Sequence, residues 1–477
     1  MPTPTWVSDA VFYQIFPDRF ARGNGHNPPG LRAWESRPTR RGYHGGDLRG
    51  ITGRLDYLQD LGVNAIYFNP IFHAPTNHRY NATDYMRIDP LLGDLKDFQE
   101  LIAAAKHRGM RVILDGVLNH SGREFFAFQD VLEKGENSAY KDWFFIHRYP
   151  LNAYGRGKAT EYEAWWGFRE LPKLNTDNPE VRKYLFDMTL FWLDQGIDGW
   201  RLDVPNEIGF PFWEQYSRVV KAANPEAYLV GEIWHLQPEW TQPGRLDGLM
   251  NYPLRKLILE GLGARLPNTD VVPSAVRTSS LAPSQMAAQA EALWQAYPAE
   301  NNLAMYNLLA SHDTTRTLTA LRGHAAKTRL AYALLFAFPG APAIYYGDEV
   351  GMRGGKDPAS RGGFPWDERS WDVDLRDWIK TLIAARKASA PLKRGVYYNL
   401  LHDDAAGVFS FGRRLGTEQV AAVFNFSSRP AAATLDAGAL GMPGGAQDLL
   451  SGQRYVAEAG RLAVRLPAWG VAWLAAV

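Results

Sequence analysis

Short apolar runs typical of β-strands alternate with longer stretches of helical apolar spacing along most of this chain. Eight such runs indicate strands, at residues 11–17, 63–68, 111–117, 198–204, 227–234, 246–252, 305–311 and 342–347. Helical stretches lie between them, for example at 48–61, 94–108 and 179–195, the last with Asn178 as its N-cap and Pro179 at its first position. Strands that alternate with helices form parallel βα units. The pattern therefore predicts an α/β fold with a (β/α)₈ (TIM) barrel, whose active site lies at the C-terminal ends of the strands.

Two segments depart from this alternation. Residues 119–178 show no clean helical repeat and many aromatic and glycine residues, which predicts a small domain inserted after the third strand. After a helix expected near 372–388, short apolar runs at 407–412, 419–426, 462–465 and 470–476 alternate with glycine-rich turns. We therefore expect a barrel at 1–118 and 179–390, an inserted domain at 119–178 and an all-β sandwich domain at 391–477.

Charge and composition exclude several classes of partner. The 52 Lys and Arg residues nearly balance the 51 Asp and Glu residues and no long basic run occurs, so neither nucleic acid nor an anionic membrane is expected as a partner. No apolar run approaches the length of a transmembrane helix, and the N-terminus lacks the features of a signal peptide. The absence of cysteine excludes disulfides and Cys-ligated metals. We expect a cytoplasmic protein.

The segment Gly199-Trp200-Arg201-Leu202-Asp203-Val204 forms the fourth predicted strand. Arg201 and Asp203 are two residues apart, so their side chains point to the same face. An Arg beside an Asp lowers the pKa of the carboxyl group and keeps it ionised. An oriented carboxylate can act as a nucleophile, although an isolated pair of this kind also occurs as a purely structural ion pair.

Other strand ends carry further polar groups. The third predicted strand ends at Asp115 and leads to His120, Glu232 follows the fifth, His312-Asp313 follow the seventh, and Asp348-Glu349 follow the eighth. Crowded carboxylates raise one another's pKa and destabilise a fold, so a cluster of them on one rim indicates a catalytic site. Aromatic residues in Gly/Pro-rich loops, such as Tyr80 and Trp234, suit stacking on sugar rings, although they also pack loops onto a core.

Four regions, Asp115–His120, Gly199–Asp203, Glu232 and His312-Asp313, together resemble the motif regions of the α-amylase family, glycoside hydrolase family 13. Within that family, Leu171-Pro172-Lys173-Leu174-Asn175 and Val204-Pro205-Asn206-Glu207 resemble signatures of the neopullulanase, cyclomaltodextrinase and maltogenic amylase subgroup. Many members of that subgroup carry a separate β-sandwich before the barrel. Since the first strand is expected by residue 11, we expect this chain to lack that domain and to be a monomer or a homodimer.

The resemblance implies a retaining hydrolase that cleaves α-1,4-glucosidic bonds in maltooligosaccharides, cyclodextrins or related α-glucans through a covalent glycosyl-enzyme, with α-1,6 bonds left open as a second target. It implies that Asp203 is the nucleophile, Glu232 the acid and base, and Asp313 the third carboxylate, which stabilises the transition state. Arg201 would orient Asp203. The implied substrate-binding residues are Tyr80, Asp115, His120, His312, Glu207, Trp234 and Arg316.

The resemblance also concerns calcium. No cofactor is expected to be required, but Asn24, Asn27, Gly45 and Asp47 stand where the subgroup has a calcium loop, so a structural calcium ion is one possibility. Arg22, Asn24 and Pro28 replace Asn and Asp residues of that pattern, which should weaken binding of the cation. No His/Glu spacing in the sequence suggests catalytic zinc.

Three alternatives to this function stay open at the level of sequence. A cyclic maltosyl-maltose hydrolase and a transglycosylase of the trehalose synthase type would use the same chemistry on other α-glucans. A non-catalytic relative, such as the amylase-like ectodomain of amino-acid transporter heavy chains, would lack the catalytic acids and carry a transmembrane helix. All three acids are present in this sequence, which favours an enzyme.

Overall fold

A closed barrel of eight parallel strands forms the centre of the computed structural model, which describes residues 3–23, 30–264 and 280–477. The strands are hydrogen-bonded in the order β8-β7-β6-β5-β2-β1-β10-β9, and a parallel bridge between Met250 and Tyr306 closes the ring. Their bounds are Phe12–Ile15 (β1), Ala65–Phe68 (β2), Arg111–Gly116 (β5), Gly199–Leu202 (β6), Tyr228–Gly231 (β7), Gly248–Leu249 (β8), Tyr306–Leu308 (β9) and Ala341–Tyr345 (β10). Seven of them lie within predicted segments, and β10 begins one residue before its segment, which confirms the barrel.

Helices surround the barrel, and the strands are buried on both faces. The α6 helix begins as predicted, because the Asn178 side chain accepts a hydrogen bond from the Glu180 backbone at 2.8 Å. No helix among the described residues is both long and apolar enough to cross a bilayer. The main helices are α2 (Leu48–Thr52), α3 (Leu55–Leu61), α4 (Leu95–His107), α6 (Pro179–Asp194), α7 (Phe210–Ala223), α8 (Tyr252–Gly261), α9 (Pro283–Gln295), α12 (Ala325–Ala337) and α13 (Val373–Ala388).

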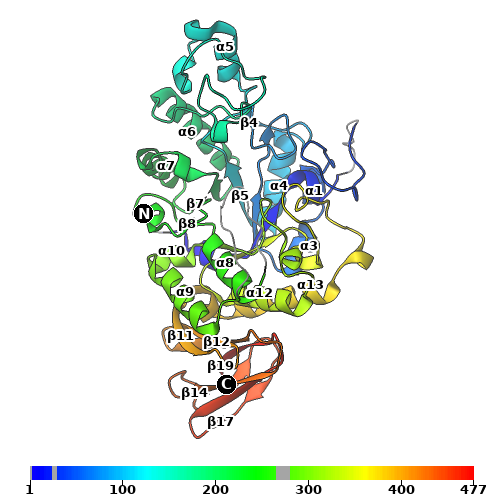
Figure 1. Cartoon of the computed structure of the whole chain (residues 1–477), viewed down its shortest axis with the longest axis vertical. Coiled ribbons are helices and arrows are strands. Elements are labelled where there is room, and N and C mark those ends of the chain that lie inside the picture. The colour runs from blue at the N-terminus through cyan, green and yellow to red at the C-terminus, as the bar shows by residue number, and fades with distance from the viewer. Residues whose placement is uncertain (1–2, 24–29, 265–279) are drawn as a thin grey trace.

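The segment between β5 and α6 forms a small body at one end of the molecule in Figure 1, where α5 (Phe126–Lys134) is labelled. Buried aromatic side chains pack inside it, among them Phe128, Phe144 and Tyr162. A bridge between His120 and Lys173 joins its two ends beside the barrel rim. A short hairpin, β3 (Phe72–His73) with β4 (Asp84–Ile88), follows β2 and was not predicted.

Two antiparallel sheets form the C-terminal part, which lies at the opposite end of the molecule from α5 (Figure 1). The larger sheet has the order β11-β12-β13-β19-β15-β16 and the smaller one β14-β18-β17. The four predicted runs fall in β12, β13, β18 and β19, whereas the other strands were not predicted. The bounds are Val396–Asp403 (β11), Val408–Leu415 (β12), Glu418–Asn425 (β13), Ala431–Asp436 (β14), Ala446–Asp448 (β15), Arg454–Tyr455 (β16), Ala457–Glu458 (β17), Arg461–Leu466 (β18) and Val471–Ala476 (β19).

Candidate active site

The end of β6 presents Arg201 and Asp203 on the barrel rim, and both side chains are buried. Gly199 lets β6 lie close to β7, because its φ is 152° and a Cβ there would lie 2.1 Å from the Tyr228 carbonyl oxygen. Val204 then adopts the left-handed conformation, with φ 37° and ψ 52°. That conformation strains a β-branched residue, and such strain is concentrated at functional sites. The sharp turn after Asp203 fixes the direction of its carboxylate.

Arg201 lies among three carboxylates. Its Nη1 donates to Asp115 Oδ1 at 2.8 Å and to Asp203 Oδ1 at 2.7 Å. Its Nη2 lies 2.9 Å from Glu232 Oε2, and the side chain is 1% exposed. The three acids come from the ends of the adjacent strands β5, β6 and β7. One buried guanidinium therefore offsets the repulsion among the acids that the rim brings together.

Burial governs the protonation of this cluster. It raises the pKa of Asp203 well above the usual value; Arg201 opposes the rise and Glu232 adds to it. Arg201 thus lowers the pKa of Asp203 as predicted, but burial outweighs that effect. Burial also raises the pKa of Glu232. Asp203 accepts a well-directed hydrogen bond from Arg201, whereas the 2.9 Å contact of Glu232 with Nη2 is not a hydrogen bond in geometry. Glu232 accepts a longer hydrogen bond, 3.3 Å, from the Val204 backbone N–H. Because a short bond from a charged donor favours the ionised form more strongly, the geometry favours an ionised Asp203 with the proton on Glu232.

His312 and Arg361 hold the third acid, Asp313. His312 Nε2 lies 2.9 Å from Asp313 Oδ2, and Arg361 Nη2 donates to Asp313 Oδ1 at 3.1 Å. Burial alone would raise the pKa of Asp313, but these two neighbours lower it below its usual value. Gln14 Nε2, on β1, donates to His312 Nδ1 at 2.9 Å, so in the neutral ring Nε2 carries the hydrogen. Asp313 is therefore an ionised carboxylate.

Tyr80 lies between His312 and Asp115 and contacts both. Its hydroxyl donates to Asp115 Oδ2 at 2.7 Å and lies 2.7 Å from His312 Nε2. The rings of Tyr80 and His312 are stacked, with centroids 5.3 Å apart and planes at 9°. Asn69 Nδ2 donates to the Tyr80 hydroxyl at 2.9 Å, and the Tyr67 hydroxyl donates to Asp115 Oδ2 at 2.5 Å. The predicted residues Tyr80, Asp115 and His312 thus belong to one network.

His120 presents a ring nitrogen for hydrogen bonding. Asn119 Nδ2 lies 3.2 Å from His120 Nδ1, while His120 Nε2 is buried and has no partner among the described residues. Burial lowers the pKa of His120 to about 3, so the ring is neutral. It stacks on Trp165 (5.5 Å, 24°), which stacks on Trp166 (4.9 Å, 10°). The arrangement places a neutral ring beside an aromatic surface, which suits a hydroxyl-rich ligand.

Two further predicted residues, Glu207 and Trp234, follow β6 and β7 along the chain. Glu207 Oε2 lies 3.7 Å from Lys173 Nζ, so the two sequence signatures that contain these residues meet in space. Trp234 stacks on Tyr252, with ring centroids 3.7 Å apart and planes at 11°. Glu207, Lys173 and Trp234 are partly exposed, whereas Tyr252 is buried.

The structure corrects the role predicted for Arg316. Its side chain is fully buried, with Nη1 bonded to Asp348 Oδ1 at 2.8 Å and to the Tyr346 carbonyl oxygen at 2.7 Å. Its Nε donates to the Ser360 carbonyl oxygen at 2.9 Å. Because its side chain is fully buried and held by these contacts, Arg316 anchors the 352–363 loop, which does not match the predicted role in substrate binding.

Some residues of the site were not predicted. Gln14 lies on β1 and Asn69 directly follows β2. Polar residues at the C-terminal ends of barrel strands face the rim, so the sequence could have indicated both. Arg361 stands in a long loop far from any strand end, and only the folded loop brings it to Asp313.

The described part of the predicted calcium loop does not fit a calcium ion. Asn24 and Asn27 lie outside the described residues, and Gly45 donates its N–H to Asp18. The Asp47 carboxylate already accepts from the backbone of Gly50 at 2.7 Å and of Gly23 at 3.0 Å. Arg22 brings a positive charge into the loop, where it donates to the carbonyl oxygens of His44 at 2.7 Å and Arg32 at 2.9 Å. Within the described residues, no group of three acidic or His side chains could hold a metal.

Comparisons with known proteins agree on one family. The model of the α-amylase catalytic domain matches residues 14–381, and that of the maltogenic amylase C-terminal domain matches residues 398–473. Neopullulanase 2 of Thermoactinomyces vulgaris is 43% identical over 89% of this chain and 70% of its own length. A cyclomaltodextrinase of Geobacillus thermopakistaniensis is 41% identical over 98% of this chain and 77% of its own. The solved structure of a cyclic α-maltosyl-(1→6)-maltose hydrolase from Arthrobacter globiformis, in complex with that sugar, has a TM-score of 0.89 and 39% identity and covers 100% of both chains.

Proposed function

This chain belongs to the α-amylase family of glycoside hydrolases, and from that membership we propose that it cleaves α-1,4-glucosidic bonds of short or cyclic maltooligosaccharides with retention of configuration. The single observation that carries the proposal is the cluster of Asp203, Glu232 and Asp313 around one rim, with Arg201 among the acids. Retaining glycosidases need one carboxylate that attacks and one carboxylic acid that donates a proton. The cluster supplies both from adjacent strands.

Asp203 attacks the anomeric carbon, and its bond to Arg201 favours the ionised form that attack requires. Glu232, whose pKa is raised by burial, transfers its proton to the oxygen of the leaving sugar as that bond breaks. The product of this step is a glycosyl ester on Asp203. In the second step Glu232, now ionised, takes a proton from water. The oxygen of that water attacks the anomeric carbon, which releases the sugar and frees Asp203.

The surrounding groups bind the sugar ring that reacts. The ionised Asp313 accepts hydrogen bonds from ring hydroxyls and stabilises the positive charge that develops at the anomeric centre. His120 Nε2 bonds to a further hydroxyl, His312 holds Asp313 and the Tyr80 hydroxyl in place, and the Tyr80 ring lies beneath the sugar. Asp115 holds Arg201 and Tyr80 in place.

Glu207 and Trp234 lie beyond the acid and contact the leaving part of the substrate. The match over 100% of both chains with the cyclic α-maltosyl-(1→6)-maltose hydrolase favours that sugar as a second candidate substrate. The sites for both candidates use the same acids, so only the shape of the surrounding loops separates them. The expectations of a cytoplasmic location and of a monomer or a homodimer remain predictions.

Product analysis on β-cyclodextrin, maltotriose, starch and cyclic maltosyl-maltose tests the proposal. We expect small cyclic or linear sugars to be cleaved faster than starch and the first product to be the α-anomer. Release of the β-anomer first would overturn retention, and a strong preference for starch would overturn the substrate class. Asp203→Asn should lower kcat on the order of 10⁴-fold, while Asp377→Asn, a change at an exposed Asp on α13, should leave it unchanged.

A further inference from the structure

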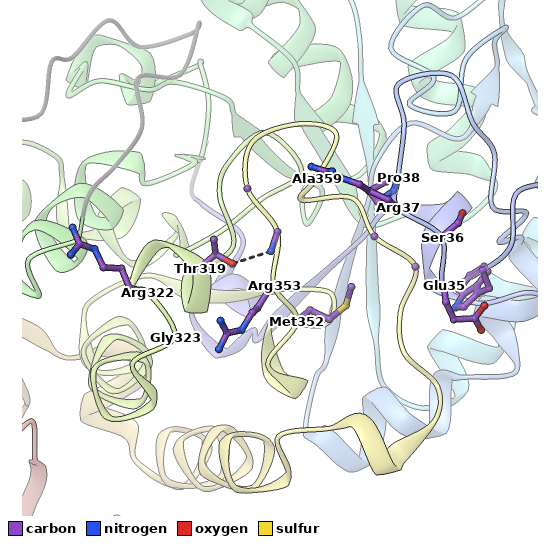
Figure 2. A pocket seen from close by; sticks show the side chains of 15 residues that line it. Glu35, Ser36, Arg37, Pro38, Thr319, Arg322, Gly323, Met352, Arg353 and Ala359 are labelled. Carbon is purple, nitrogen blue, oxygen red and sulfur yellow. Dashed lines mark hydrogen bonds between the residues drawn. The ribbon is translucent and has the colours of Figure 1, made fainter.

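A pocket separate from the three acids lies beside the loop that holds Asp313. Its volume is about 690 Å³, within the range of pockets that bind small organic molecules. Three chain segments line it, residues 34–38, residues 319–323 and residues 352–363 (Figure 2). None of the proposed catalytic residues lines this pocket.

Each segment contributes one exposed arginine, Arg37, Arg322 and Arg353. None of the three is paired with a carboxylate within the part of the chain that the structure describes. Two other arginines behave differently, since Arg361 of the 352–363 segment is paired with Asp313, and Arg316, just before the 319–323 segment, is paired with Asp348. Glu35 is the one carboxylate among the lining residues that are described. The lining therefore has an excess of positive charge.

The rest of the lining is small and rich in hydrogen-bond donors. Five glycines contribute to it, and at Gly355 a Cβ would meet nothing within 4 Å, so the backbone is open to the pocket. At Gly323, which has a φ of 78°, a Cβ would lie 2.7 Å from Arg353 Nη2, so only glycine leaves this guanidinium in place. Thr319 Oγ1 accepts from the Gly354 backbone at 3.0 Å, and its own hydrogen is left to donate. The pocket suits a ligand rich in acceptors.

One wall of the pocket is shared with the active site. Ala359, Gly362 and Gly363 line the pocket. Between them, Ser360 Oγ donates to the His312 carbonyl oxygen at 3.0 Å, and Arg361 donates to Asp313. The backbone of the 352–363 loop therefore separates a molecule in the pocket from the side chains that hold the third acid.

We propose that this pocket binds the phosphoryl group of a phosphorylated glucose unit. Guanidinium groups pair with phosphate oxygens, and a phosphate offers three acceptors and up to two negative charges, whereas a carboxylate offers fewer of both. The volume leaves room for the sugar as well as the phosphate. The phosphoryl group belongs either to a free sugar phosphate or to the α-glucan itself; the sugar part of the proposal rests on the proposed function.

Calorimetric titration of the full chain with glucose 6-phosphate, inorganic phosphate and glucuronate tests the site. We expect glucose 6-phosphate to bind most tightly, and Arg353→Gln and Arg37→Gln each to weaken it about tenfold. Arg465→Gln, at an exposed arginine of β18 in the C-terminal part, is the matched control and should change nothing. Absence of phosphate and glucose 6-phosphate binding, equal affinity for glucuronate, or an affinity that the Arg353 and Arg37 variants leave unchanged would overturn the proposal.

Hydrolysis assays separate the two sources of the phosphoryl group. If a free sugar phosphate is the ligand, glucose 6-phosphate will change the KM or kcat for maltotriose in the unmodified enzyme and not in Arg353→Gln. If the substrate carries the phosphate, a maltooligosaccharide with a 6-phosphate on one glucose will have a lower KM than the plain sugar, and Arg353→Gln will remove the difference. The titrations need no hydrolysis, so a failure of the proposed function leaves their outcome readable.

Discussion

Replacing Arg201 with methionine removes the guanidinium that contacts three buried acids. Two hydrogen bonds are lost, from Nη1 to Asp115 and to Asp203, together with the contact of Nη2 with Glu232. Hydrogen bonds to charged groups contribute about 1.5–3 kcal/mol each. Since one pKa unit corresponds to about 1.36 kcal/mol, loss of the bond to Asp203 raises its pKa by about 1–2 units.

The consequence for activity has a definite sign. In the proposed mechanism Asp203 attacks only when ionised, so the acid limb of kcat/KM against pH should move upward by about 1–2 units in Arg201→Met. The free energy of unfolding should also change with pH, because it depends on the pKa of Asp203 in the folded state. Burial already places the folded-state pKa of Asp203 above its unfolded value, and removing Arg201 raises it further. For such an acid, stability is highest at low pH and falls as pH rises through the folded-state pKa, so the variant should lose most stability, about 3–5 kcal/mol, at neutral and higher pH.

The assay is kcat/KM for maltotriose between pH 4 and 9, with urea unfolding over the same range. Arg413→Met is the matched control, because Arg413 is also a fully buried arginine but, among the described residues, bonds to the carbonyl oxygens of Gly395 and Ala337 and to no carboxylate. It should lose stability without moving the acid limb. If Arg201→Met loses activity while its acid limb stays where it was, Arg201 does not control the ionisation of Asp203 and the argument fails.

Three further predictions concern residues around the barrel. Burial raises the pKa of Glu349 to about 7, and its Oε1 accepts from Tyr13 and Tyr57 at 2.7 Å. The unfolding free energy should therefore fall by about 3 kcal/mol as pH rises from about 4.5 to about 7, and urea titrations of Glu349→Gln should show this fall removed. Val204→Gly should relieve backbone strain and leave the melting temperature equal or higher, while kcat falls because Asp203 is less well fixed; an unchanged kcat would contradict this. Chelation with EDTA should leave the melting temperature unchanged, whereas Arg22→Met should cost about 1 kcal/mol of stability; a drop with EDTA that CaCl₂ restores would refute the account of the calcium loop.

The barrel was predictable because its strands are buried on both faces. Such strands appear in the sequence as compact apolar runs, and each of the eight runs overlaps a strand of the barrel. Their order along the chain also placed the acids, because parallel strands bring all of their C-terminal ends to one rim. The strands of the C-terminal part were predicted less completely, since β11 and β14 are half exposed and carry no continuous apolar run.

The sequence could not show which groups the ends of the long arginine side chains contact. Arg316 and Arg361 both follow the third acid along the chain and both carry a guanidinium, yet one is paired with Asp348 inside the fold and the other reaches Asp313. The choice depends on the path of the 352–363 loop, which Arg316 itself fixes by donating to the Ser360 carbonyl oxygen. Residue type and spacing do not distinguish the two arginines. Their contacts depend on backbone carbonyl groups that take up their positions only when the chain folds. Strand ends are different, since the register of a parallel barrel decides in advance which side chains face the rim. For this fold, a role assigned to a strand-end residue therefore rests on geometry that the sequence pattern already implies, whereas a role assigned to a loop arginine needs the loop.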